Sequence, residues 1–200
     1  MNVRIQYPTV FNAGIYYENE MIMNTYRVNI FMMTNSPDGE ISNIALNRIK
    51  YFINTEIDSS IFISEEDVEQ SQKYVDAGLK ITTMPDAAID QLVCLMLFYK
   101  LTAITEGKIY IGEIELSSDI GEDIIYSHGD IEDIGDTKVP DWWKTADLAH
   151  CDSELINTDK IVTVHQSRVW RELDLSWPDT VNSTDTTVVF ADFKKLDDSE

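Results

Sequence analysis

One segment constrains the fold of this chain more than any other: an unbroken run of eight apolar residues, Leu92 to Tyr99. A membrane span needs about 20 apolar residues, so this run is too short to be one. Pro85 suits the first turn of a helix, and Asp90 complements the positive charge at a helix start. Apolar side chains surround the predicted helix on nearly every side, which requires other elements to cover it. We therefore predict a strongly buried helix over 86–106, at the centre of the core.

Two further helices are expected from periodicity and capping. Between 41 and 54, apolar residues recur at helical spacing and leave one polar face. Ser64 and Asp67 form the start of a capped helix, and Gly78 suits its end. These signals predict helices over 41–54 and 65–77.

The remaining apolar residues follow strand patterns. Alternation predicts two opening strands, at 3–7 and 26–32. Shorter or later strand candidates are 60–63, 79–83, 109–116, 124–126, 161–170, 173–177 and 186–193. Strands followed by interspersed helices and then a run of strands predict an α+β fold, with a mainly antiparallel sheet packed around the buried helix.

The length of 200 residues and the 44% apolar content fit one folded domain. We predict a single α+β domain over 1–193, with an acidic irregular insertion at about 127–158. Residues 194–200 are expected to form a polar tail.

Negative charge is concentrated in one part of the chain. The formal net charge is −21, and residues 113–159 contribute 14 acidic side chains against two basic ones. Such a surface repels phosphate and anionic lipid, so direct binding to nucleic acid or membrane is not expected. A basic protein, such as a nucleic-acid-binding enzyme, is the expected partner. Aromatic anchors would supply affinity that charge alone does not. Two alternatives stay open: the acidic stretch is a solvated loop that only keeps the protein soluble, and both tryptophans pack inward to hold that loop. The predicted partner-binding residues are Asp130, Glu132, Asp133, Asp136, Asp141, Trp142 and Trp143.

Signals for catalysis and metal binding are weak. The three histidines have no zinc-site spacing, and no phosphate-cradling glycine motif is present. Asp130 begins a partial calcium-loop pattern that lacks a ligand at Ile134, which leaves weak divalent-cation binding open. We predict no catalytic residues, no metal site and no cofactor. A metal-dependent hydrolase using Asp86, Glu113 and Glu115 remains an alternative.

These observations lead to one main functional hypothesis and two alternatives. The main one is a non-enzymatic acidic protein that binds a basic partner, for instance as a nucleic-acid-mimicking inhibitor or as an immunity or anti-defence protein. One alternative is a structural or assembly protein, such as a phage virion component. The other is the carboxylate hydrolase. A cytoplasmic location is expected because the sequence has no standard secretion signal.

Overall fold

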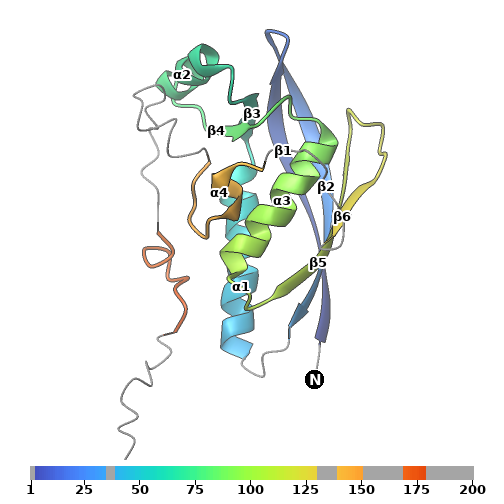
Figure 1. Ribbon diagram of the computed structural model, residues 1–200, viewed down its shortest axis with the longest axis vertical. Helices are drawn as coiled ribbons and strands as arrows, with labels where there is room; N and C mark the ends of the chain where they lie inside the picture. Colours follow the sequence, from blue (N-terminus) through green and yellow to red (C-terminus); the bar gives the residue numbers. More distant parts are fainter. Residues whose placement is uncertain (1–2, 35–38, 130–138, 151–168, 179–200) are drawn as a thin grey trace, which may run out of the picture.

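The computed structural model describes residues 3–34, 39–129, 139–150 and 169–178. The strands are β1 (Val3–Tyr17), β2 (Glu20–Thr34), β3 (Ser60–Ser64), β4 (Ile81–Met84), β5 (Tyr110–Ser118) and β6 (Tyr126–Gly129). The helices are α1 (Gly39–Tyr51), the π-helix η1 (Phe52–Ile57), α2 (Val68–Asp76), α3 (Asp90–Thr105) and α4 (Asp141–Lys144). The strands form one mixed sheet in the order β4-β3-β1-β2-β5-β6. The predicted α+β class is confirmed (Figure 1).

A long hairpin forms the middle of the sheet. β1 and β2 pair antiparallel along their whole length, from Val3 opposite Thr34 to Tyr17 opposite Glu20. β5 and β6 continue the antiparallel sheet on the β2 side. On the other side, β3 runs parallel to both β1 and β4. Three of the five pairings are therefore antiparallel, as the sequence predicts.

Different elements pack on the two faces of the sheet. Along β2, Tyr26, Val28 and Ile30 are buried, whereas Arg27 between them is exposed, which is the alternation of a strand with one covered face. The buried residues belong to the main core with α1 and α3. α2 packs through Val75 on a smaller cluster that includes Tyr16, Ile61, Ile63 and Ile81. Among the described residues, no helix covers the outer face of β1, β2 and β5, and this face is called the open face below.

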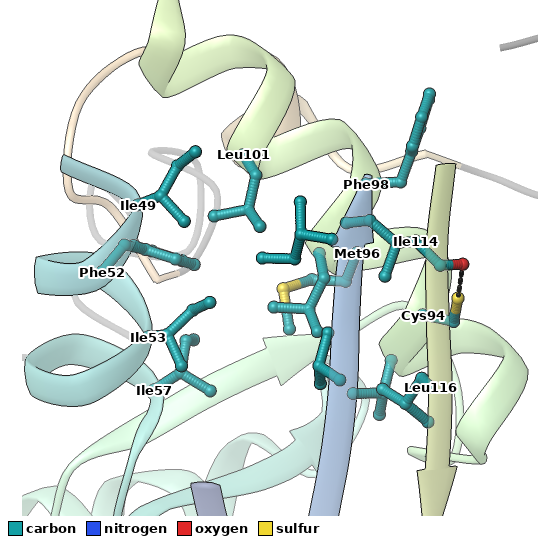
Figure 2. Close-up of a cluster of buried hydrophobic side chains, with 14 of the residues drawn as sticks. Ile49, Phe52, Ile53, Ile57, Cys94, Met96, Phe98, Leu101, Ile114 and Leu116 are labelled. Carbon is teal, nitrogen blue, oxygen red and sulfur yellow. Dashed lines mark hydrogen bonds between the residues drawn. The ribbon is translucent and has the colours of Figure 1, made fainter. Parts of the chain in front are cut away.

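Helix α3 is the centre of the main core, and this prediction is confirmed. Figure 2 shows Ile49, Phe52 and Ile53 on one side of the cluster that contains Met96 and Leu101 of α3. The side chains of Ile114 and Leu116 reach the same cluster from β5. The Cys94 thiol donates a hydrogen bond to the Ile114 carbonyl oxygen at 3.4 Å. A helix without a polar stripe is stable here because sheet, helices and loops cover it.

The second helical region departs from regular geometry. The helix predicted over 41–54 begins at Gly39, and from Phe52 it continues as the π-helix η1. The amide of Asp58 donates to the Ile53 carbonyl, five residues back, at 2.8 Å. The wider turn keeps Phe52, Ile53 and Ile57 all buried. Such π-helical turns are rare, and the spacing of apolar residues in the sequence does not reveal them.

The predicted strand at 173–177 is wrong, and so is the end of the one predicted at 161–170. Residues 169–178 form a turn and irregular chain without strand pairing. The Arg48 guanidinium holds this segment: Nε donates to the Leu175 carbonyl at 2.8 Å, and the group stacks over the rings of Trp170 and Trp177. Strand-like residues are used here for packing on α1. The strands predicted at 161–168 and 186–193 lie outside the described residues.

Residues 127–158, expected to be irregular, contain two regular elements. β6 extends to Gly129, and Asp141–Lys144 forms the short helix α4. Residues 130–138 and 151–158 of this stretch lie outside the described residues.

Candidate ligand-binding site

A hollow of about 360 Å³ lies on the open face of the sheet. Its lining residues are Pro8, Thr9, Val10, Arg27, Val28, Asn29, Glu115, Leu116, Ser117 and Ile125. A hollow of this size falls at the small end of the range for small-molecule sites, and its lining is mixed, with a few polar groups among apolar ones.

The strand register explains why the hollow forms there. Pro8 of β1 lies opposite Asn29 of β2, which lies opposite Glu115 of β5. In the adjacent row, Val10 lies opposite Arg27, and Arg27 lies opposite Ser117. Residues directly opposite each other share a face of the sheet. These two rows combine short side chains with longer polar ones, and the short ones leave space between them.

Polar contacts fix the positions of the longer side chains. The Asn29 amide Nδ2 donates to Glu115 Oε2 at 3.2 Å. Arg27 donates from Nη2 to Asp119 Oδ1 at 2.7 Å and from Nη1 to Asp123 Oδ1 at 2.9 Å. The hydrogen bond and charge of Asp119, with the charge of Asp123, raise the pKa of the Arg27 guanidinium. In turn, the hydrogen bonds from Arg27 and Thr25 lower the pKa of the Asp119 carboxyl.

A buried contact anchors the loop between β5 and β6, which supplies Asp119, Asp123 and Ile125. Ser118 Oγ donates to Asp90 Oδ2 at 2.7 Å, and the amide of Gly121 donates to Ser118 Oγ at 3.0 Å. Burial raises the pKa of the Asp90 carboxyl. A Cβ atom on Gly121 would lie 2.3 Å from Asp90 Oδ2, so this close approach needs glycine. The loop beside the hollow is therefore tied to helix α3.

The structure places the predicted partner-binding residues differently from what the sequence suggested. Trp142 is 2% exposed and Trp143 is 0% exposed, so neither ring is available as a surface anchor. Asp141 is exposed, with 93% of its side chain accessible. The four other acids, Asp130, Glu132, Asp133 and Asp136, lie outside the described residues.

Lysine 100 explains why this tryptophan pair is buried. Its Nζ is fully buried and donates to the carbonyl oxygens of Trp142 at 2.7 Å and Thr145 at 3.0 Å. It also contacts Asp147 Oδ1 at 3.3 Å. Burial lowers the pKa of the Lys100 ammonium to about 8, although Asp147 partly opposes the effect. An ammonium inside the core needs these acceptors, and satisfying it draws the backbone of α4 inward.

His150 forms a second polar contact on the covered side of the sheet. Its Nε2 lies 2.9 Å from Glu56 Oε2, and its carbonyl oxygen accepts from the Thr83 amide at 2.9 Å. Burial raises the pKa of the Glu56 carboxyl, but His150, Tyr51 and Lys80 together outweigh burial and leave that pKa below its usual value. These contacts fasten residues 145–150 to the edge strand β4.

The carboxylates named for a hydrolase do not come together. Glu113 and Glu115 lie on β5, whereas Asp86 follows β4, and three strands separate β4 from β5 in the sheet order. Within the described residues, no group of three or more His, Cys, Asp or Glu side chains is placed to hold a metal ion. In that same part of the chain, no helix is both long enough and apolar enough to cross a membrane.

Comparisons with known proteins give structural similarity only. No protein-family model and no curated protein matches the sequence. An uncharacterized protein from Wolinella succinogenes is similar over 64% of this chain and 98% of its own, with a TM-score of 0.47 and 9% identity. The 6-pyruvoyl tetrahydropterin synthase of Plasmodium vivax covers 64% of this chain and 97% of its own, at a TM-score of 0.41 and 10% identity. The Plasmodium falciparum enzyme is similar over 64% of this chain and 98% of its own, with a TM-score of 0.40 and 12% identity.

The function expected from charge is corrected by these findings. The tryptophans that were expected to anchor a basic partner are inside the core. The solved structures reported above are two tetrahydropterin synthases and an uncharacterized protein. A concentration of acidic residues is thus a poor guide to function in this chain, because charge carries no information about which aromatic side chains reach the surface.

Sequence reasoning missed most of the hollow. The sequence predicts Glu115 only as a metal ligand, and it gives no prediction for Arg27, Asn29 and Ser117. One signal was available: polar residues alternate with apolar ones along β2, which places Arg27 and Asn29 on the same face. The register with β1 and β5, which completes the site, is a property of the folded sheet.

Proposed function

We propose that this chain is a small-molecule-binding protein and that the ligand occupies the hollow on the open face of β1, β2 and β5. The observation that carries the proposal is the hollow itself, of about 360 Å³, with Asn29 and Glu115 hydrogen-bonded to each other in its wall. Apolar surface from Val10 and Ile125, exposed beside these polar groups, supplies the area that a ligand would cover.

Two features support a binding role for this face. The described helices of the main core all pack on the other face, and α2 packs at the β3 and β4 end. The polar side chains of the hollow are held before any ligand arrives, Arg27 by two carboxylates and Glu115 by Asn29. Preorganised groups lose little conformational freedom on binding, which favours affinity.

The proposed role is binding without a chemical step. The residues that line the hollow include no histidine and no cysteine, and the guanidinium of Arg27 is committed to Asp119 and Asp123. The hydroxyl of Ser117 therefore has no imidazole base among its neighbours in the lining.

A fragment screen by NMR with a pocket-filling variant tests the proposal. Ser117→Trp should fill the hollow, whereas Gln6→Trp changes the same face outside the lining residues and serves as the matched control. Fragments that shift the amide signals of residues 27–29 and 115–117 should bind the wild type and Gln6→Trp alike and should lose binding in Ser117→Trp. Equal binding to Ser117→Trp, or no fragment that shifts these amides, would refute the proposal.

A further inference from the structure

The chemistry of the hollow indicates which class of ligand it favours. Glu115 accepts one hydrogen bond, from Asn29 to Oε2, and no other described residue donates to its second oxygen, Oε1. The amide oxygen of Asn29 also receives no donor from the part of the chain that the structure describes. Two hydrogen-bond acceptors are therefore available to a ligand from neighbouring residues, and one of them is charged.

The charge balance excludes an anionic ligand. Arg27 is the one cation in the lining, and both of its terminal nitrogens are bound to carboxylates. Glu115 in the lining balances its charge, and Asp119 and Asp123, the partners of Arg27 in the adjoining loop, make the surroundings of the hollow net negative. A phosphate or carboxylate ligand would meet net negative charge and a guanidinium already engaged, whereas a cation would be attracted.

The shape of the lining adds a further requirement. Val10 and Ile125 expose apolar side chains, and Pro8 presents a rigid ring in the same row as Asn29 and Glu115. A flat group with an apolar body can cover these surfaces while its edge donates to the acceptors. A planar cation with several N–H donors in one edge matches a carboxylate best, because its hydrogen bonds are charge-assisted and parallel.

We propose that the hollow binds a small organic cation whose planar amidinium or guanidinium edge donates to Glu115 and Asn29. This inference rests on the proposed binding function and adds the ligand class. The cation carries its donors on a small apolar body that lies against Val10 and Ile125.

Three probes of similar shape but different charge test which class of ligand the hollow binds. Benzamidine carries an amidinium, benzoate a carboxylate and benzyl alcohol a neutral hydroxyl on the same ring. Each is titrated into the full chain while the amide signals of residues 27–29 and 115–117 are followed by NMR. Benzamidine should shift these signals saturably and bind at least about tenfold more tightly than the other two, as expected for a charge-assisted pair.

Matched variants assign the contact. Glu115→Gln keeps the size of the side chain and removes its charge, and it should weaken benzamidine binding at least about tenfold. Asn29→Ala, a second variant, should also weaken it. Glu113→Gln makes the same change two positions earlier on β5, outside the lining, and should leave the affinity within about twofold of the wild type.

Each remaining outcome contradicts one of the two claims. Benzamidine that binds Glu115→Gln as tightly as the wild type would overturn the assigned contact. Benzoate or benzyl alcohol that shifts the same amides more tightly than benzamidine would overturn the ligand class and leave the binding function intact. If none of the three probes shifts these amides at millimolar concentration, while other fragments do, the ligand class fails. If no fragment of any class does so, the binding function fails as well.

Discussion

Replacing Lys100 with methionine should change how the stability of this protein depends on pH. The Lys100 ammonium is fully buried, and burial lowers its pKa from the ordinary 10.5 to about 8. Methionine is of similar length and apolar, so it fills much of the same space without a titrating group. The stability difference between wild type and Lys100→Met therefore isolates the titration of this one side chain.

The sign follows from which state binds more protons. Between about pH 8 and pH 10.5 the unfolded chain keeps the lysine protonated while the folded chain has released the proton, so folding gains stability as the pH rises. The penalty of burying the charge is fully present below pH 8 and disappears above pH 10.5. The two pKa values correspond to roughly 3 kcal/mol in total, of which about 2 kcal/mol should be recovered between pH 7 and pH 10.

Urea unfolding of both proteins at pH 7, 8, 9 and 10, followed by tryptophan fluorescence, measures this difference. Relative to Lys100→Met, the wild type should gain about 2 kcal/mol over that range. Burial raises the pKa of Tyr26, so this residue lowers the stability of the fold when the pH rises above the ordinary pKa of tyrosine. Tyr26 is present in both proteins, so its effect cancels in the stability difference. A stability difference that stays constant from pH 7 to pH 10 would refute the reasoning, because the lysine would then titrate alike in folded and unfolded chains.

Three further changes test the packing. Met96→Ala should lower the free energy of unfolding by about 2 to 5 kcal/mol in urea melts, since the side chain is fully buried, and Leu79→Ala, at an exposed site, should change it far less. Gly121→Ala should lower the free energy of unfolding by about 1 to 3 kcal/mol because the new Cβ would displace Asp90 from Ser118. Gly39→Ala has open space around the new Cβ and should be neutral or stabilising. Equal effects of the two substitutions would contradict the close approach at Gly121. Arg48→Lys should lower the free energy of unfolding by about 2 to 4 kcal/mol and expose residues 169–178 to limited proteolysis. Lysine cannot donate to the Ile104 and Leu175 carbonyls and also stack on the two indole rings. An unchanged cleavage pattern would argue against this anchor.

The elements that could be predicted from sequence are those that a local pattern determines. The buried helix α3 follows from its all-round apolar composition, and β1 and β2 follow from alternation. The strand predicted at 173–177 is wrong because Leu173, Leu175 and Trp177 have the spacing of a strand but pack against the main core, with the Trp177 ring beside Arg48 of α1. Local patterns report which residues are buried and do not report which partner buries them.

The candidate site depends on long-range arrangement to a greater degree. Pro8, Asn29 and Glu115 form one row only because two strand pairings have a particular register, and that register is set by the whole sheet. Trp142 and Trp143 look like surface anchors in an acidic stretch, yet Lys100, 42 residues before Trp142, draws them into the core. Neither the register nor the contact with Lys100 can be predicted from the residues that neighbour the site in the sequence.

A crystal structure of the protein with benzamidine tests the central claim most directly. The amidinium should lie in the hollow on the open face of the sheet, with its nitrogens within hydrogen-bonding distance of Glu115 and its ring against Val10 or Ile125. An empty hollow at a benzamidine concentration that saturates the NMR signals, with the probe ordered elsewhere on the protein, would contradict the account.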